Sequence, residues 1–172
     1  MRREDFLPVL QDSFSAYYDV FPNDDQSETS LPLAFRADYF SRAEKYWLSK
    51  SIKIWGNETN EFAYIFSSDS FDSKTAEECV QYALDQGLPR VKPHKEHQYT
   101  NIKVVFVADK LDEETVKYIQ NRKYSKNYKF SLHGFTELKT AAVEMETEKV
   151  FHNRAGHEMT DYFRKLFAAN KK

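Results

Sequence analysis

A run of mostly apolar residues at 101–108, NIKVVFVA, constrains the fold of this chain more than any other feature. The run has the length of a strand and is far shorter than the roughly 20 residues that a membrane-spanning helix needs. Continuous apolar runs of this kind are typical of buried strands. A second run, FAYIF at 62–66, has the same character and is expected to form a central strand. The chain is therefore predicted to fold around a sheet with buried strands.

The composition supports one domain with a core of its own. The chain has 172 residues, of which 41% are hydrophobic and 30% charged, and its formal net charge is −2. A chain of this length buries roughly 70% of its extended surface on folding. Aromatic residues make up 16% of the chain, so we expect rings to fill the core and tyrosines to lie at its edges. We predict a single α+β domain over residues 1–172, with a loop or short linker at 22–32.

The spacing of apolar residues predicts the order of the elements. From Phe6 to Phe21 they recur at helical spacing, with Asp5 as a candidate cap. The other elements are expected as strands within 35–48, 50–55 and 61–67, a helix at 75–86, the strand 101–108, a helix ending at 121, a strand at 128–132, two strands within 137–152 joined by a turn at 146–148, and a helix at 159–167. The order αβββαβαββα corresponds to a mixed sheet with an N-terminal antiparallel meander and packed helices.

Local signals set several of these boundaries. The sequence GNETN at 56–60 is typical of the loop of a hairpin. The segment 75–78, TAEE, is a capping box, and Gly87 is a typical stop for the helix that it begins. Asp109 or Asp112 is expected to cap the next helix.

The single cysteine, Cys79, bears on both chemistry and location. One cysteine excludes an intramolecular disulfide and a zinc site built on several thiolates. Cys79 shares an apolar helical stripe with Val80 and Ala83, so it is expected to be buried rather than nucleophilic. No secretory signal and no apolar run long enough to span a membrane is visible in the sequence. The cytoplasm is the expected location, and a membrane is not an expected partner.

One segment interleaves bases with tyrosines. Residues 116–136 contain five bases and no acid, whereas 57–85 contain seven acids and one base, which predicts a dipolar surface. Rings between cations can hold single-stranded nucleic acid without reading its sequence. The alternative is the solvated end of a helix with half-buried tyrosines. The candidate binding residues are Lys117, Tyr118, Arg122, Lys123, Tyr124, Lys126, Tyr128 and Lys129.

Two histidines have a spacing that is suggestive of metal ligands. His94 and His97 would share a face of a helical turn and could hold a divalent ion together with Glu96 or a distant carboxylate. Two ligands are too few, so a third would have to come from His133, His152 or His157. The alternative is a solvated or structurally bonded loop. A divalent metal is the cofactor class that this spacing suggests, and no cofactor is clearly implied.

Two further positions combine polar side chains with a glycine. His133 precedes Gly134 and is expected on the same strand face as neighbouring polar residues, where it could be a general base or bond to a loop. Arg154 lies before Gly156 and a predicted helix, an arrangement that suits a carboxylate or phosphate. The alternative for this second stretch is a strand-to-helix connection capped by Asn153.

The opening order αβββαβ resembles the common core of the restriction-endonuclease-like (PD-(D/E)XK) nucleases. That resemblance implies a metal-dependent core in which an acid on the second core strand and a (D/E)-x-K tripeptide on the third bind the metal that activates water. The chain departs from the pattern, because its strand at 50–55 has no acid and its strand at 61–67 has no x-K partner. The usable E-x-K is Glu137-Leu138-Lys139, with Asp109 upstream.

Four segments, EKYWLSKSIKIWGNETNEFAYIF, VKPHKEHQYT, KFSLHGF and VFHNRAG, are similar to those of uncharacterised bacterial proteins with no assigned activity. That resemblance implies no mechanism. Three function classes therefore stay open. The first is a non-enzymatic binding or interaction domain, with a homodimer as one form of it. The second is a nucleic-acid-associated protein with a nuclease-like core. The third is an enzyme that depends on a metal or small ligand and uses histidines.

Overall fold

The computed structural model describes the backbone of residues 1–23, 29–46 and 53–170, and the side chains of these residues except those in 44–55. Within these ranges the α-helices are α1 (Arg3–Ser15), α2 (Ser73–Gly87), α3 (Glu113–Asn121) and α4 (Glu158–Ala169). The strands are β1 (Asp19–Pro22), β2 (Leu33–Tyr46), β3 (Lys53–Phe71), β4 (His97–Leu111), β5 (Ser125–Asn127), β6 (Phe135–Glu144) and β7 (Lys149–His152). Two short 3₁₀ helices are η1 (Leu88–Arg90) and η2 (Arg154–Gly156).

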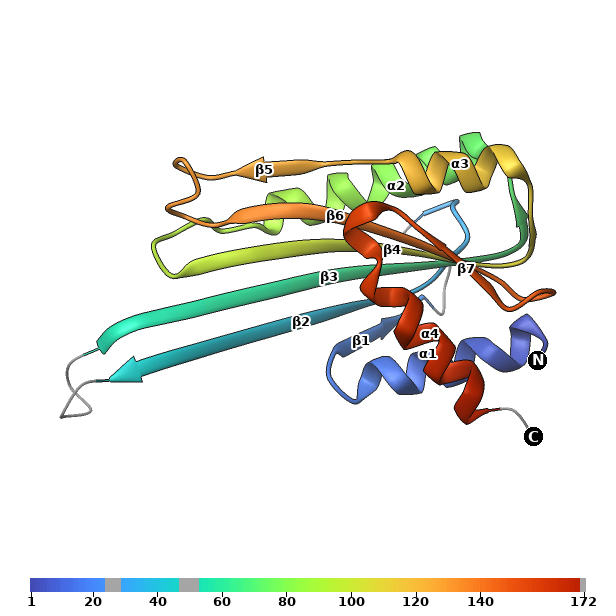
Figure 1. Cartoon of the computed structure of the whole chain (residues 1–172), viewed down its shortest axis with the longest axis horizontal. Coiled ribbons are helices and arrows are strands. Elements are labelled where there is room, and N and C mark those ends of the chain that lie inside the picture. The colour runs from blue at the N-terminus through green and yellow to red at the C-terminus, as the bar shows by residue number, and fades with distance from the viewer. Residues whose placement is uncertain (24–28, 47–52, 171–172) are drawn as a thin grey trace.

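The strands of the described residues form one mixed sheet in the order β1-β2-β3-β4-β6-β5, and β7 also pairs with β6 (Figure 1). β1, β2 and β3 are antiparallel, and β3, β4 and β6 are parallel. β5 pairs with the start of β6 and β7 with its end, both antiparallel. The predicted fold class, an α+β domain with a mixed sheet and an N-terminal antiparallel meander, is confirmed.

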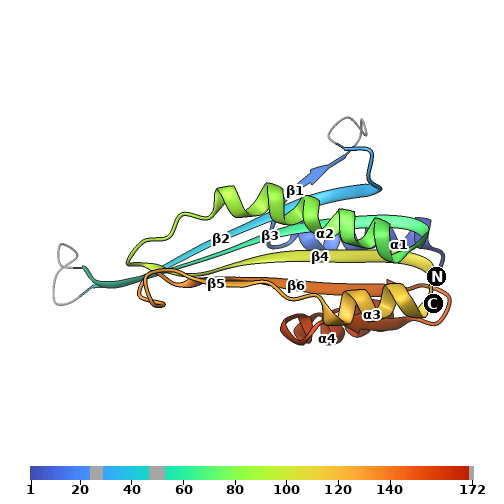
Figure 2. The same cartoon turned by 90° about the horizontal axis from the view of Figure 1, so that it is seen from above.

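Helices cover both faces of the sheet, α2 and α3 on one face and α1 and α4 on the other (Figures 1 and 2). Successive side chains of a strand point to opposite faces. In β4, Val104 and Phe106 therefore belong to the core under α2 and α3, while Val105 and Val107 belong to the core under α1 and α4. This double burial is the reason why 101–108 is apolar at almost every position.

Aspartates start two of the helices. The Asp72 carboxylate accepts a hydrogen bond from the Thr75 backbone N–H at 2.6 Å, and the Asp112 carboxylate accepts one from Thr115 at 2.7 Å. The prediction of Asp112 as a cap is thus confirmed. The predicted capping box at 75–78 was wrong, because the N-cap of α2 is Asp72, three residues before Thr75. Gly87 is the last residue of α2, and a Cβ there would lie 3.0 Å from the Ile102 side chain. A close approach of α2 to β4 therefore favours glycine at this position.

The predicted hairpin loop at 56–60 was wrong. These residues lie inside β3, where they pair with β2 on one side, as in Asn60 with Phe40. Asn60 also pairs with Thr100 of β4 on the other side. Pairing on both sides keeps the chain extended despite the turn-forming composition. The connection between β2 and β3 falls at 47–52, outside the described residues, and both strands run past the helices (Figure 2).

The first helix is shorter than predicted. α1 begins at Arg3 rather than at Asp5 and ends at Ser15, and Phe21 belongs to β1, which pairs with β2. Phe6, Leu10 and Phe14 are buried as the helical spacing predicts. Of the loop predicted at 22–32, Pro22 closes β1 and residues 24–28 lie outside the described residues. The helical spacing continues into residues 19–22, but these residues form a strand because they pair with β2.

The predicted strand at 128–132 was also wrong, because these residues form a turn between β5 and β6. Lys129, Phe130 and Ser131 have positive φ angles, and the Phe130 side chain is 99% exposed. Gly134 follows at φ +76°, where a Cβ would lie 2.5 Å or less from two backbone oxygens of β4. Glycine is therefore required at this turn. The sequence predicts that His133 shares a strand face with Lys129 and Ser131. This prediction was wrong, because the three residues lie in a turn.

The C-terminal third otherwise follows the prediction. Strands β6 and β7 are joined by a turn, and α4 buries Met159, Phe163 and Phe167. Cys79 is fully buried in the core under α2, and burial raises the pKa of its thiol to about 12. Among the described residues, no helix is both long and apolar enough to cross a membrane.

Candidate functional site

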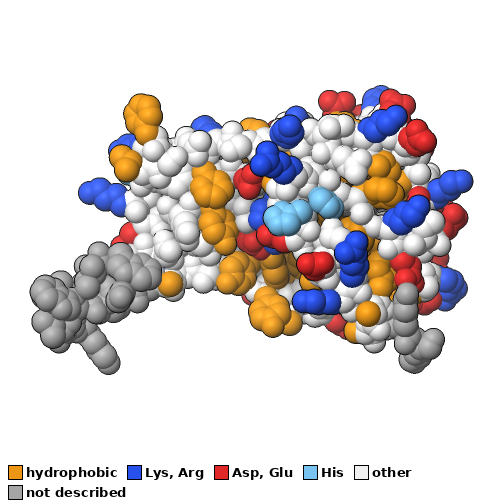
Figure 3. All heavy atoms as spheres, in the orientation of Figure 1, with side chains coloured by type: hydrophobic (Ala, Val, Ile, Leu, Met, Phe, Trp, Pro, Cys, Tyr) orange, Lys and Arg blue, Asp and Glu red, His pale blue; other side chains and the backbone are white. Residues whose placement is uncertain are grey.

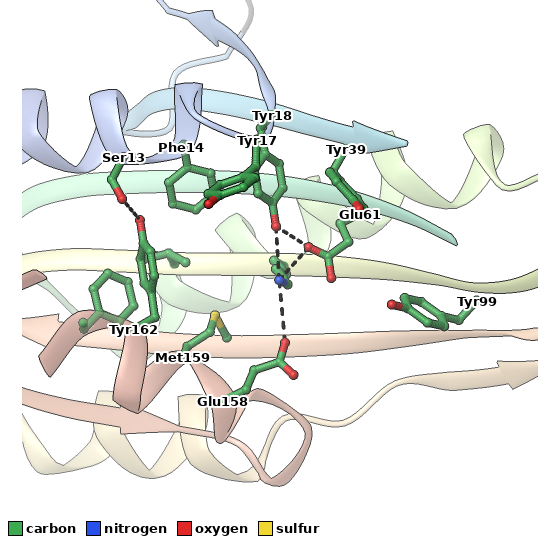
Figure 4. Close-up of a pocket in the computed structure, with 13 residues that line it drawn as sticks. Ser13, Phe14, Tyr17, Tyr18, Tyr39, Glu61, Tyr99, Glu158, Met159 and Tyr162 are labelled. Carbon is green, nitrogen blue, oxygen red and sulfur yellow. Dashed lines mark hydrogen bonds and ion pairs between the residues drawn. The ribbon is translucent and has the colours of Figure 1, made fainter. Parts of the chain in front are cut away.

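A cleft of about 470 Å³ opens on the sheet face that carries α1 and α4, and we call it the tyrosine cleft. Figure 3 shows this face, on which hydrophobic side chains gather around a few acidic and basic ones. The cleft lies where the end of α1 and the start of α4 leave part of the sheet uncovered (Figure 4). Its five tyrosines are Tyr17, Tyr18, Tyr39, Tyr99 and Tyr162.

A charged pair forms the floor of the cleft. The Lys103 ammonium donates to Glu61 Oε2 at 2.7 Å and to the Tyr18 hydroxyl at 3.3 Å. The Tyr18 hydroxyl in turn donates to Glu61 Oε2, and the Asn101 amide donates to Oε1 at 3.1 Å. The side chains of Lys103 and Glu61 are only 12% and 13% exposed. The pair is therefore held in one geometry and largely shielded from water.

Glu158, at the start of α4, extends this pair into a network. Its Oε1 lies 2.9 Å from the Lys139 ammonium and 3.6 Å from that of Lys103. The Lys139 side chain is 12% exposed, whereas that of Glu158 is 46% exposed at the rim. Two lysines and two glutamates thus face one another, and the charges of the network cancel.

The environment moves the titration of the floor away from neutral pH. Burial, reinforced by the Glu61 carboxylate, raises the pKa of Tyr18 well above its ordinary value. Burial alone would raise the pKa of Glu61, but Lys103, Tyr18 and Asn101 together lower it. At pH 7 the phenol is therefore protonated and the carboxylate ionised. Efficient general acids and bases have a pKa near the operating pH, and neither of these groups does.

Aromatic rings form the walls. Phe14 anchors the α1 side, with ring centroids 4.9 Å from Tyr18 and 6.0 Å from Tyr162. The Tyr162 hydroxyl donates to Ser13 at 2.9 Å, which ties α4 to α1 beside the cleft. The Tyr39 ring lies 5.5 Å from that of Tyr18 on the opposite wall. Contacts between rings and one hydrogen bond thus hold the walls on the α1 side together.

Strand alternation assembles the floor. Glu61, Lys103 and Lys139 are odd-numbered residues of β3, β4 and β6, and Ala63, two residues after Glu61, pairs directly with Lys103. In turn, Lys103 pairs directly with Lys139. Alternation along the strands therefore turns all three side chains to the α1/α4 face, with Glu61 two residues before the level of Lys103 and Lys139. Farther along the strands, the same face is apolar and buried under the helices.

Comparison with known proteins places the chain in a family without assigning an activity. Residues 2–165 match a family described as "Domain of unknown function (DUF8052)". The chain belongs to the DUF8052 family. No curated protein and no solved structure matches it. The match fits the resemblance to uncharacterised proteins, while the resemblance of this DUF8052 domain to nucleases is not confirmed.

The nuclease-like candidates are not brought together. Asn101 pairs with Glu137 and Ala108 with Glu144, so Asp109 lies about eight residues, roughly 26 Å, along the strands from Glu137. Asp109 instead accepts a hydrogen bond from Arg3 Nε at 3.3 Å. Of the E-x-K motif, Lys139 joins the charged network of the tyrosine cleft. The structure therefore does not bring these three residues together in one site.

His94 and His97 are neighbours that hold a loop. The Nδ1 atom of His97 donates to the His133 carbonyl at 2.7 Å, and its Nε2 atom lies 2.9 Å from the Thr100 hydroxyl. His94 Nε2 lies 3.1 Å from Glu58. Within the described ranges no three His, Cys, Asp or Glu side chains are grouped to hold a metal ion. The structure therefore favours the bonded-loop interpretation of these histidines.

The remaining histidine candidates are not gathered around a common point either. Desolvation and the nearby Lys129 lower the pKa of His133, whose backbone carbonyl holds His97. His152 lies on β7, where its Nδ1 contacts the Asn153 carbonyl at 2.8 Å, and His157 is exposed just before α4. A general-base role for His133 stays a prediction.

The segment at 117–129 uses its tyrosines in structural contacts. Tyr118 and Tyr124 pack against the core under α2 and α3, and the Tyr128 hydroxyl lies 3.0 Å from that of Thr136. The Tyr128 ring also stands edge-on to His97. The bases Lys117, Lys123, Lys126 and Lys129 are exposed, and Arg122 is half-buried. Nucleic-acid binding by this segment stays a prediction.

The stretch around Arg154 follows the structural alternative. Asn153 is 2% exposed, and its Oδ1 accepts from the backbone N–H groups of Gly156 at 2.8 Å and Thr140 at 3.1 Å. Its Nδ2 donates to two backbone carbonyls, those of Arg122 and Leu138. Asn153 thus caps η2 and ties three segments together. Arg154 is exposed, and anion binding by its side chain stays a prediction.

Sequence reasoning missed the cleft floor, although a signal was present. Lys103 is the one charged residue inside the apolar run 101–108, and Glu61 directly precedes FAYIF. A charged residue in a strand that is otherwise buried needs a partner on its own face. Glu61, the acidic residue next to the other buried strand segment, is the candidate partner of Lys103 that this signal indicates. Tyr18 carried no comparable signal, because the turn after α1 positions it.

Proposed function

We propose that this domain is a non-enzymatic binding domain that takes a small neutral molecule with a planar ring into the tyrosine cleft. The observation that carries the proposal is the combination of a preformed cleft with five tyrosines and a floor whose charges are already paired. The volume of about 470 Å³ lies within the range of small-molecule sites.

The titration of the floor supports binding over acid–base catalysis. A catalytic pair has one group poised to lose a proton and another poised to gain one near neutral pH. Here the pKa of Tyr18 is raised and that of Glu61 lowered, so both groups keep their protonation state across the neutral range. They present fixed dipoles to a ligand.

The walls indicate the class of ligand. The hydroxyls of Tyr39 and Tyr99 form no hydrogen bond with another described residue, and both side chains line the cleft (Figure 4). Tyrosine rings offer flat surfaces for a ring of the ligand, and free hydroxyls offer it hydrogen bonds. Because the charges of the floor cancel, a charged ligand gains no net attraction.

Ligand-detected NMR with three matched probes tests the proposal: benzamide, benzoate and benzylamine share a ring and differ in charge. We expect benzamide to bind best. Tyr99→Ser removes one wall and should weaken that binding about 3- to 10-fold, the range typical of an aromatic contact. Phe130→Ala, which removes an exposed ring that does not line the cleft, is the control and should leave binding unchanged. Equal binding by wild type and Tyr99→Ser would refute the assignment.

Two further expectations accompany this proposal. The cytoplasm is proposed as its location, supported by the single, fully buried cysteine. A homodimer stays a prediction, supported by exposed aromatic side chains such as Phe40, which is 59% exposed. Native mass spectrometry of the untagged chain separates a dimer from a monomer, and truncation of Phe40 to alanine should dissociate a dimer that depends on this ring.

A further inference from the structure

A second cavity, of about 320 Å³, lies on the opposite face of the sheet between β2, β3 and α2. We call it the arginine pocket, and its lining residues are Arg36, Tyr64, Tyr82, Gln86 and Arg90. It is separate from the tyrosine cleft, because Arg36 and Tyr64 are even-numbered partners on β2 and β3 and point to the α2 face.

One of the two arginines is held by the protein itself. The Arg90 guanidinium forms two hydrogen bonds with the Asp38 carboxylate, one of them 3.1 Å long, and lies 3.9 Å over the Phe62 ring. Asp38 is 7% exposed. This bidentate pair fixes the guanidinium plane and uses only part of its hydrogen-bonding capacity, since a guanidinium has five N–H groups.

The other arginine, Arg36, has no acidic partner among the described residues. Arg36 is half-buried, and its guanidinium lies 4.6 Å over the Phe21 ring. No hydrogen bond or ion pair joins it to any residue within the described ranges. Aromatic stacking orients the guanidinium and leaves its N–H groups available. With Asp38 neutralising Arg90, the described residues of the pocket carry one net positive charge.

Neutral donors complete the lining. The Tyr64 side chain is 2% exposed, and burial raises the pKa of its phenol, so the hydroxyl is protonated at neutral pH. The Tyr64 and Tyr82 rings meet edge to face at 6.1 Å, which holds both in place. Gln86, one turn after Tyr82 on α2, adds an amide at the mouth. The polar groups thus come from two strands, α2 and η1.

We propose that the arginine pocket binds the phosphoryl group of a small phosphate monoester. An uncompensated guanidinium in a concave site selects an anion. Polar groups that come from several elements around a cavity suit a tetrahedral phosphoryl group better than a planar carboxylate. The volume exceeds that of phosphate alone and leaves room for a small organic group beside Tyr82. This proposal is independent of the ligand of the tyrosine cleft.

Isothermal titration calorimetry at low ionic strength tests the proposal with phenyl phosphate, inorganic phosphate and benzoate. We expect phenyl phosphate to bind more tightly than inorganic phosphate and benzoate to bind weakest. Arg36→Gln should weaken phenyl phosphate about 10- to 100-fold, because it removes a charged donor. The control Arg164→Gln changes an arginine on α4 whose side chain is 72% exposed and should leave the affinity unchanged.

A second variant covers the case in which Arg36→Gln fails to fold. Gln86→Glu changes an exposed helical residue and places a negative charge at the mouth of the pocket, so it should also weaken phenyl phosphate. Undiminished affinity in either folded variant, or no binding of phenyl phosphate to the wild type at millimolar concentration, would overturn the proposal. Benzoate binding as tightly as phenyl phosphate would replace the phosphoryl group by a carboxylate and overturn it as well.

Discussion

The tyrosine cleft and the arginine pocket lie on opposite faces of β2 and β3, and they differ in how their charged side chains are paired. In the cleft, Lys103 is paired with Glu61. In the pocket, Arg90 is paired with Asp38, but Arg36 has no acidic partner within the described ranges. Buried ions need partners, so paired ions belong to the framework, whereas an unpaired cation is available to a ligand. Lys103 and Arg90 thus form ion pairs that belong to the fold, whereas Arg36 is available to bind an anionic ligand.

The largest effect is expected at the floor of the cleft. Lys103→Met leaves the Glu61 carboxylate, 13% exposed, without its cation, which should lower the free energy of unfolding by about 3–5 kcal/mol. Lys103→Met combined with Glu61→Leu removes both charges and should recover most of that loss. Urea denaturation of the two variants measures both values. A double variant as unstable as the single one would show that the pair itself stabilises the fold.

The next effect distinguishes the two arginines of the pocket. Arg90→Gln leaves buried Asp38 unpaired and should cost about 2–3 kcal/mol, less than a fully buried pair because the Arg90 side chain is 31% exposed. Arg36→Gln leaves no acid of the described residues unpaired, so its stability should stay within about 0.5 kcal/mol of the wild type. Thermal unfolding compares them directly. Similar losses in both variants would contradict the division into framework and ligand-binding charges.

The pH dependence of stability tests the ionised state of the cleft floor. The pKa of Glu61 is lower in the folded chain than its ordinary value of 4.5, so Glu61 contributes stability above that value. This contribution is lost as the pH falls through the folded-state pKa, because protonation removes the ion pair with Lys103. In Glu61→Gln the decline of stability below pH 4.5 should be shallower than in the wild type. Parallel acid profiles would refute this account.

The smallest effect distinguishes two tyrosines of one cleft. Tyr18→Phe removes a hydroxyl bonded to Glu61 and Lys103 and should cost about 1 kcal/mol. Tyr99→Phe removes a hydroxyl that bonds no described residue, so stability should change by less than about 0.5 kcal/mol while benzamide binding weakens. Chemical denaturation and ligand-detected NMR measure the two consequences. If Tyr99→Phe lost as much stability as Tyr18→Phe, the Tyr99 hydroxyl would stabilise the fold, which contradicts this prediction.

Much of the fold could be predicted because its signals are local. The apolar run 101–108, the aspartate cap at 112, the turn at 146–148 and the stripe of α4 each act within one element, and the structure confirms them. The errors fell where distant pairing overrode local preference. Residues 56–60 have turn composition, but β2 and β4 hold them extended on both sides. Tyr128 and its successors alternate like a strand, yet they form a left-handed turn beside His97.

The candidate site was less predictable, because its members come from distant elements. Tyr18, Glu61, Lys103 and Glu158 meet only when α1, β3, β4 and α4 are assembled. The residues that the sequence singled out were prominent for their type and spacing. His97 and Asn153 prove to be satisfied structural groups, and Asp109 pairs with Arg3 at the far end of the sheet.

By itself the sequence determined the fold class, the burial of Cys79 and the central place of residues 101–108, since hydrophobic periodicity is written along the chain. Only the tertiary structure decided which charges are paired. Strand order and register bring Lys103 beside Glu61 and leave Arg36 against Phe21, and neither choice is local. Whether a charged side chain stabilises the fold or is available to a ligand depends on the residue that faces it. That residue lies on another strand or on a helix that packs over the sheet.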